Sequence, residues 1–210
     1  MSAVLDTLVL ATHNVHKLAE LRRVLEGEGV GVAVVGLDAF EAHPEPAETE
    51  DSFEGNALIK ARAAAVRTGL PALADDSGLE VDALNRMPGV RSSRWSGPSA
   101  TDESNLRLVL AQLDDVPDPR RTARFVCAMA LVLPDGTEHV LRRTMEGRLA
   151  REPDGDHGFG YDPIFVTDGF DVTNGRLSPA QKDAVSHRGQ AVRAMAAVLA
   201  GLRDRQASGT

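Results

Sequence analysis

Apolar runs and helical repeats alternate along the first part of the chain. Residues 7–12 (TLVLAT) and 30–37 (VGVAVVGL) are short β-rich runs, and both predict buried strands. Between them, four apolar residues recur at helical spacing: Leu18, Leu21, Val24 and Leu25. Glycines at positions 27 and 29 end this predicted helix. The resulting strand–helix–strand order is typical of an α/β fold.

The middle of the chain continues the alternation. Residues 52–69 are alanine-rich and predict a helix with Asp51 or Ser52 as its N-cap. Residues 71–76 (PALADD) predict a third strand that ends at the adjacent acids. Residues 101–113 predict a further helix, capped by Thr101.

Two long strands dominate the second half of the pattern. Residues 122–133 and 138–149 predict a hairpin, because the turn signal PDG joins them. A short strand follows a glycine-rich loop, and Ser178, Pro179 and Gln181 predict a capping box before the last helices. An antiparallel hairpin beside strand–helix–strand units predicts an α/β fold with a mixed sheet and flanking helices.

Composition limits the classes of partner. The chain has 210 residues, a formal net charge of -8 and a pI near 5.2. An acidic chain of this kind argues against wrapping a nucleic acid polymer, but it is compatible with a small basic pocket for one phosphorylated ligand. No apolar stretch reaches membrane-spanning length, and the first residues lack a signal-peptide pattern, so we expect no membrane association and a cytoplasmic location. The single cysteine, Cys127, predicts a buried core thiol.

The stretch THNVHK (residues 12–17) is a candidate phosphate site. It follows the first predicted strand and opens the first helix, where backbone N–H groups and the helix dipole favour an anion. Thr12 and Asn14 add side-chain donors, and Lys17 adds a positive charge. The alternative is an ordinary N-cap by Asn14 with a solvated lysine.

The adjacent acids Asp75 and Asp76 are candidates for metal binding. Side chains alternate along a strand, so one acid can face a ligand while the other caps a turn at Ser77 and Gly78. Mg²⁺ is commonly held by one or two carboxylates together with substrate phosphates. The acidic loop before the alanine-rich helix could supply a second carboxylate from one of four residues: Glu48, Glu50, Asp51 or Glu54. The alternative is that the pair serves only turn and cap chemistry.

Two further motifs carry groups suited to a flat ring. GFGYD (residues 158–162) places two aromatic side chains in one glycine-rich loop, which suggests a stacking surface or, alternatively, a loop anchored by a buried Phe159. SHRG (residues 186–189) offers His187 and Arg188 near Lys182, and these groups suit a purine edge or an anion. A solvated helix face is the alternative for the second motif.

Taken in order, five motifs resemble those of the Ham1/inosine triphosphatase family, the pyrophosphatases of non-canonical purine nucleoside triphosphates that include the bacterial dITP/XTP diphosphatases. The motifs are THNVHK, ETEDSFEGNALIKA, ADDSGLEVDAL with PGVRSSRW, GFGYDPIF and LSPAQKDAVSHRG. The resemblance covers about residues 7–202. It implies a single two-lobed pyrophosphatase domain over residues 1–203, with an elongated mixed sheet around a central cleft and a frayed tail at 204–210.

The resemblance also implies an activity and its cofactor. Family members are usually Mg²⁺-dependent homodimers that cleave ITP, dITP and XTP between the α and β phosphates, releasing the monophosphate and pyrophosphate. This chain could instead act on another modified nucleotide set, or be a regulatory nucleotide-binding module without turnover. The retained Lys17, Glu48 and Asp76 speak against a loss of activity.

Site roles follow from the resemblance residue by residue. Glu48 and Asp76 would bind the metal, and Asp76 would also be the base for water. Ser77 would contact substrate. The residues implied to hold the triphosphate are Thr12, His13, Asn14, Val15, His16, Lys17 and Lys60. Those implied to surround or recognise the 6-oxo purine are Phe159, Gly160, Tyr161, Asp162, Lys182, His187 and Arg188.

Three positions depart from the family pattern. His13 stands where the first loop commonly has Gly, which predicts some backbone strain if that Gly has a positive φ. Gly55 replaces a glutamate, so if that glutamate supports the metal, Glu54 or water must substitute. The stretch AQK (residues 180–182) replaces EEK, and we expect this change to be minor.

Overall fold

A computed structural model describes residues 5–12, 15–41 and 43–207 of the chain, except the side chains of Val15, His16, Glu20, Gln206 and Ala207. The chain folds into two compact units. Unit 1 comprises residues 1–76, 128–142 and 189–210, and unit 2 comprises residues 77–127 and 143–188. Strands β3 (Ala72–Val81), β5 (Thr122–Val132) and β6 (Glu138–Leu149) contribute residues to both units.

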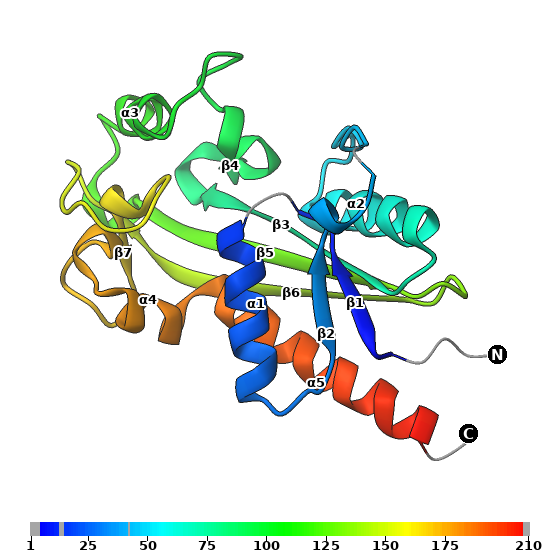
Figure 1. The fold of residues 1–210 in the computed structure, drawn as a ribbon. Coiled ribbons are helices and arrows are strands. Elements are labelled where there is room, and N and C mark those ends of the chain that lie inside the picture. The colour runs from blue at the N-terminus through cyan, green and yellow to red at the C-terminus, as the bar shows by residue number, and fades with distance from the viewer. Residues whose placement is uncertain (1–4, 13–14, 42, 208–210) are drawn as a thin grey trace. The chain divides into compact units, whose positions relative to one another are not determined.

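Unit 1 is built on parallel strands with helical crossovers. Strand β1 (Thr7–Leu10) pairs in parallel with β2 (Ala33–Gly36) on one side and with β3 on the other. Helix α1 (Val15–Gly27) connects β1 to β2, and α2 (Phe53–Thr68) leads from β2 to β3 (Figure 1). The first crossover moves from β1 to β2, and the second moves back from β2 past β1 to β3. Right-handed connections in these opposite directions place α1 and α2 on opposite faces of the sheet. The β1/β3 boundary is therefore the topological switch point where α/β sheets bind ligands.

The remaining elements of unit 1 complete its core. The C-terminal part of β5 and the N-terminal part of β6 continue the sheet beyond β3, and most of α5 (His187–Ala207) belongs to this unit. Residues on β1 and β5 that are almost fully buried include Leu8, Val9, Ala128 and Leu131. Such continuous apolar runs are typical of strands buried on both faces.

Unit 2 contains the remaining residues of strands β3, β5 and β6. Strand β4 (Met87–Pro88) pairs antiparallel with β3, and β7 (Phe165–Thr167) pairs antiparallel with β6. Helices α3 (Asp102–Gln112) and α4 (Pro179–Val185) also lie in this unit. Its buried cluster joins strand and helix residues: Leu79, Val81, Leu106, Val109, Leu113, Phe125, Met145, Tyr161, Ile164 and Phe165.

Most predicted elements are confirmed, including the α/β class with a mixed sheet and the β5–β6 hairpin. Ser52 is the N-cap of α2 and Thr101 that of α3, and the capping box from Ser178 to Gln181 begins α4. Gln181 Oε1 accepts a hydrogen bond from the Ser178 amide, so the AQK stretch supports the helix start.

The predicted end of the third strand is wrong. Strand β3 does not stop at Asp76 but continues through Ser77 and Gly78 to Val81, so these residues form no turn. Leu79 and Val81 are fully buried in the core of unit 2, and this burial keeps the chain extended. The acids therefore lie in mid-strand, which removes the turn-capping role considered for one of them. The two-residue strand β4 was also not predicted.

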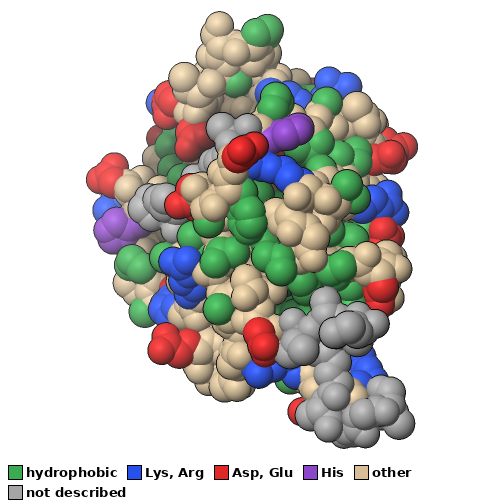
Figure 2. Space-filling view, turned by 45° about the vertical axis from the view of Figure 1, so that its right-hand side comes forward, with side chains coloured by type: hydrophobic (Ala, Val, Ile, Leu, Met, Phe, Trp, Pro, Cys, Tyr) green, Lys and Arg blue, Asp and Glu red, His purple; other side chains and the backbone are tan. Residues whose placement is uncertain are grey.

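Two surface properties bear on partners. On the face shown in Figure 2, Lys and Arg side chains are interspersed with Asp and Glu among the described residues, with hydrophobic side chains between them. Within the described parts of the chain, none of the helices combines the length and apolar character needed to cross a membrane.

Candidate functional site

Strand β3 and helix α1 bring together a lysine and a buried carboxylate in unit 1. Lys17 Nζ donates to both oxygens of Asp75, at 3.0 and 2.8 Å. The Asp75 side chain is only 4% exposed, whereas that of Lys17 is 23% exposed. A buried carboxylate is costly unless it is paired and hydrogen-bonded, so the burial of Asp75 requires the ammonium group of Lys17. The same contact fixes the position of that ammonium group at the start of α1.

Part of the predicted phosphate segment is not described. His13 and Asn14 lie outside the described residues, so the predicted backbone strain at His13 stays a prediction. Val15 and His16 open α1, although their side chains are not described. Thr12 follows the end of β1, and its amide donates to the carbonyl of Leu10 at 2.8 Å.

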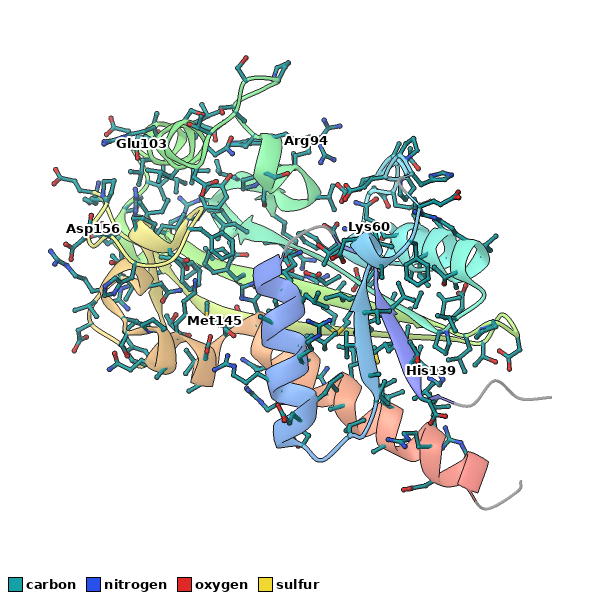
Figure 3. The ribbon with its side chains drawn as sticks, viewed as in Figure 1. Lys60, Arg94, Glu103, His139, Met145 and Asp156 are labelled. Atoms are coloured by element: carbon teal, nitrogen blue, oxygen red, sulfur yellow. The ribbon has the colours of Figure 1, made fainter. Side chains whose placement is uncertain are left out.

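A second cluster lies on the α2 side of β3. Asp76 Oδ2 accepts from Asn56 Nδ2 at 3.2 Å, and Asp76 Oδ1 lies 3.6 Å from Lys60 Nζ. Lys60 also donates to Glu48 Oε1 at 3.0 Å, so Glu48 and Asp76 converge on one ammonium group. Lys60, labelled in Figure 3, and Asn56 are four residues apart and share a face of α2. Adjacent strand residues point to opposite faces, which explains why Asp75 meets α1 while Asp76 meets α2.

The electrostatics of this cluster perturb both partners. Burial raises the pKa of Asp76, and the charge of Glu48 adds to the effect, while Lys60 and the hydrogen bond from Asn56 act in the opposite direction. Burial by itself would lower the pKa of Lys60, but the charges and hydrogen bond of Asp76 and Glu48 outweigh it and raise that pKa. Lys60 therefore keeps its proton, and Asp76 is a more basic carboxylate than an exposed aspartate.

Two other acids considered as the second carboxylate, Glu50 before α2 and Glu54 in its first turn, make different side-chain contacts. Glu54 lies 3.6 Å from Arg142 Nη1 on β6, rather than in the Asp76 cluster. Gly55 is packed against Glu50, because a Cβ added at Gly55 would lie 2.6 Å from the Cβ and Cγ of Glu50. The Gly55 amide donates to the N-cap oxygen of Ser52 at 3.1 Å. The glycine at this position therefore makes room for the Glu50 side chain.

Unit 2 contains a pocket of about 160 Å³. All of the residues predicted around the purine line it, together with the predicted Ser77: Phe159, Gly160, Tyr161, Asp162, Lys182, His187 and Arg188. Residues 77 and 159–162 are distant in sequence from 182–188, so the fold alone brings these motifs to one cavity.

The GFGYD loop is held by its own aspartate. Asp162 is 2% exposed, and its carboxylate accepts from the Phe159 amide at 2.8 Å and from Asn174 Nδ2 at 3.4 Å. Lys182 Nζ forms an ion pair with the same carboxylate. Gly158 has a φ of +79°, and a Cβ there would clash with Asp162 Oδ2. Glycine is thus needed where the carboxylate closes the loop.

Aromatic groups form much of the pocket wall. Phe159 is 64% exposed, and Lys182 Nζ lies 4.9 Å from the centroid of its ring. This exposure contradicts the alternative of a loop anchored by a buried Phe159. Tyr161 is buried instead, and its hydroxyl donates to the Ser92 carbonyl at 2.8 Å. Burial raises the pKa of Tyr161, which keeps this donor protonated.

The His187 and Arg188 motif is partly buried rather than a solvated face. His187 is 8% exposed and stacks on Phe125, with ring centroids 5.1 Å apart and an interplanar angle of 8°. Helix α4 ends with Ser186 as its C-cap, and helix α5 begins at the next residue, His187. The break between the two helices therefore directs His187 and Arg188 to the pocket.

Sequence reasoning missed several residues that line the same pocket: Ser92, Ser93, Asp102, Asn105 and Phe125. Asn105 is 3% exposed on α3 and binds the 93–96 segment, accepting from the Ser96 amide at 2.8 Å and donating to the Ser93 carbonyl at 3.2 Å. The sequence signal for Asn105 is its place in the helix beside the apolar residues Leu106 and Val109, which are buried. A polar side chain buried among them needs hydrogen-bond partners.

Comparison with known proteins gives consistent similarities. Residues 8–198 match the model of the Ham1 family. A dITP/XTP pyrophosphatase of Cutibacterium acnes is 60% identical over 204 residues, covering 96% of this chain and 100% of the relative. The corresponding protein of Mycobacterium tuberculosis is 55% identical over 203 residues, covering 96% and 98%.

Solved structures agree with these sequence matches. A dITP/XTP pyrophosphatase structure from Mycobacterium abscessus has a TM-score of 0.79 and 54% identity, covering 90% of this chain and 98% of the other. A Ham1 protein from Coxiella burnetii has a TM-score of 0.87 and 43% identity, covering 93% and 98%.

Proposed function

The chain belongs to the Ham1 family, and from that premise we propose that it is a dITP/XTP pyrophosphatase, which hydrolyses dITP, ITP and XTP to the nucleoside monophosphate and pyrophosphate. The main support for this proposal is the pocket of unit 2, because every residue predicted around the purine lines it. A relative that is 60% identical over 96% of this chain carries the same activity in its name.

Glu48 and Asp76 fit the Mg²⁺ that this activity implies. Both are partly buried carboxylates, and both already converge on the positive charge of Lys60. The raised pKa of Asp76 reflects burial beside another negative charge, which a cation would relieve. Two carboxylates with substrate phosphates are a common Mg²⁺ environment. When bound, the ion would neutralise phosphate charge and orient the reacting groups.

The chain's own groups supply the rest of the proposed reaction. Asp76 acts as general base and accepts a proton from the water that attacks the α phosphorus. The new P–O bond forms as the bond to the bridging oxygen breaks, and pyrophosphate leaves. Lys60 and Lys17 stabilise the negative charge of the triphosphate as fixed cations. Asn56 keeps the Asp76 carboxylate oriented through its 3.2 Å hydrogen bond.

Base recognition belongs to unit 2 in this proposal. The exposed ring of Phe159 offers a stacking surface, and the donor groups of His187, Arg188 and Lys182 favour a 6-oxo acceptor over the 6-amino group of adenine. Asp162 contributes through the loop that it closes, since its carboxylate is buried. For the assembly, we propose a homodimer, as the family resemblance implies, which light scattering coupled to gel filtration can test.

A pyrophosphate-release assay tests the proposal. Purified protein with Mg²⁺ is given ITP, dITP, XTP, GTP and ATP, and kcat/KM is measured for each. We expect the three non-canonical purines to be hydrolysed far faster than GTP and ATP. Binding of ITP without release of pyrophosphate would favour the regulatory-module alternative. Preferential hydrolysis of modified pyrimidine triphosphates would favour a different substrate set.

A further inference from the structure

Asp102, at the start of α3, reaches a backbone group of the GFGYD loop. Its Oδ2 accepts a hydrogen bond from the Gly160 amide at 2.8 Å, across 58 positions of sequence. Both residues belong to unit 2 and line its pocket. The contact is not part of the capping of α3, because Thr101 performs that role through a capping box with Ser104.

The position of Asp102 is fixed by that helix start. The Thr101 hydroxyl accepts from the Ser104 amide at 3.1 Å, and the Ser104 hydroxyl accepts from the Thr101 amide at 2.8 Å. Buried Asn105 then binds the neighbouring 93–96 segment. An aspartate in the first helical turn is also favoured by the helix dipole. Asp102 therefore presents its carboxylate from a rigid support.

Two successive amides of the loop are thus held by two different carboxylates. Asp162 binds the Phe159 amide at 2.8 Å from within the loop, and Asp102 binds the Gly160 amide from α3. Gly160 has a φ of +62°, and a Cβ there would meet no atom within 4 Å, so this glycine serves the backbone conformation rather than close packing.

Phe159 is 64% exposed and lines the pocket, so burial contributes little to holding it there. Besides the contact of its ring with Lys182, the two amide hydrogen bonds hold its backbone. Resting on the proposed function, we propose that Asp102 is a positioning residue that sets Phe159 as the stacking surface for the purine. In this arrangement Asp102 acts on the base through the loop, without touching the nucleotide.

Hydrogen exchange tests the positioning without any substrate. Asp102→Ala removes the acceptor, Asp102→Asn keeps an oxygen acceptor, and Glu103→Ala removes a carboxylate from the same helical turn. The side chain of Glu103 is 63% exposed and pairs with Arg107 of the same helix. We expect faster exchange of the 158–162 amides in Asp102→Ala than in the wild type or the other two variants. Equal exchange in Asp102→Ala and Glu103→Ala would overturn the proposal.

A double-mutant cycle tests whether Asp102 affects binding of the base through Phe159. In the wild-type background, Asp102→Ala should raise KM for ITP about 3- to 10-fold, the effect of losing one hydrogen bond, with kcat little changed. In a Phe159→Ala background it should have no further effect. Equal effects in both backgrounds would show that Asp102 acts directly on the nucleotide, which overturns positioning. A wild-type protein inactive on ITP would refute the proposed function, while the exchange result would still decide the role of Asp102.

Discussion

The two units hold their candidate functional groups with different kinds of interaction. In unit 1, the functional groups are charges on regular elements, and each is held by an opposite charge: Lys17 by Asp75, and Lys60 by Glu48 and Asp76. In unit 2, the pocket is shaped by a loop, aromatic rings and hydrogen bonds to backbone groups. On the proposed function, unit 1 would carry the chemistry that does not depend on the base, and unit 2 would carry the discrimination between bases.

Replacing Asp76 tests the charged cluster most severely. Asp76→Asn keeps the size of the side chain but removes the base and a metal ligand, so we expect a loss of about 10²- to 10⁴-fold in kcat on every purine triphosphate. Asp51→Asn is the control, because Asp51 is an exposed acid of the loop before α2. Pyrophosphate release at saturating Mg²⁺ measures both variants. Near-normal turnover in Asp76→Asn would remove Asp76 from the reaction.

Replacing Lys17 tests whether the contribution of unit 1 to kcat/KM is the same for every base. Loss of a charged hydrogen-bond donor costs about 1.5–3 kcal/mol, so Lys17→Ala should lower kcat/KM roughly 10- to 150-fold, equally for ITP, XTP and ATP. The variant also removes the ammonium group that pairs with the buried Asp75, and we expect a loss of about 3–5 kcal/mol in the free energy of unfolding.

A second substitution separates the two effects of Lys17. In Lys17→Ala with Asp75→Asn, the buried charge is gone, so part of the stability should return while activity stays low. Urea denaturation and the rate assay measure these outcomes. A loss of activity confined to one base would place Lys17 in recognition and break the comparison between the units.

Replacing Arg188 tests the discriminating role of unit 2. Arg188→Ala removes donors from the pocket, so the ratio of kcat/KM for ITP over ATP should shrink by about one to two decades. Measuring ITP, XTP, GTP and ATP with wild type and variant gives the ratio directly. If all four rates fall together and the ratio survives, Arg188 serves the phosphates instead.

Replacing Tyr161 gives the smallest expected effect. Tyr161→Phe removes the hydroxyl that binds the Ser92 carbonyl, so the free energy of unfolding should fall by about 1 kcal/mol. Because burial raises the pKa of Tyr161, the hydroxyl remains protonated at neutral pH and the loss should be the same at pH 6 and pH 8. Thermal unfolding at the two pH values measures it. A large change in the ITP/ATP ratio would instead assign the hydroxyl to the base.

Local signals in the sequence determined most of the elements. The caps at Ser52, Thr101 and Ser178 are visible because each side chain bonds the backbone three residues away, which needs no tertiary contact. The β5–β6 hairpin is visible for a similar reason, since the turn signal PDG lies between two long predicted strands. Each motif of the candidate site, by contrast, has an alternative interpretation when taken alone, and its proposed role follows from the resemblance to the Ham1/inosine triphosphatase family.

Tertiary structure alone decided how far β3 extends and what surrounds the motifs. The strand passes through Asp76 to Val81 because Leu79 and Val81 are buried among residues such as Phe125 and Phe165, which lie far along the chain. Asp102 meets Gly160 only through the packing of unit 2. Local patterns record the conformation of a segment, whereas burial and long-range hydrogen bonds depend on partners that no single segment contains.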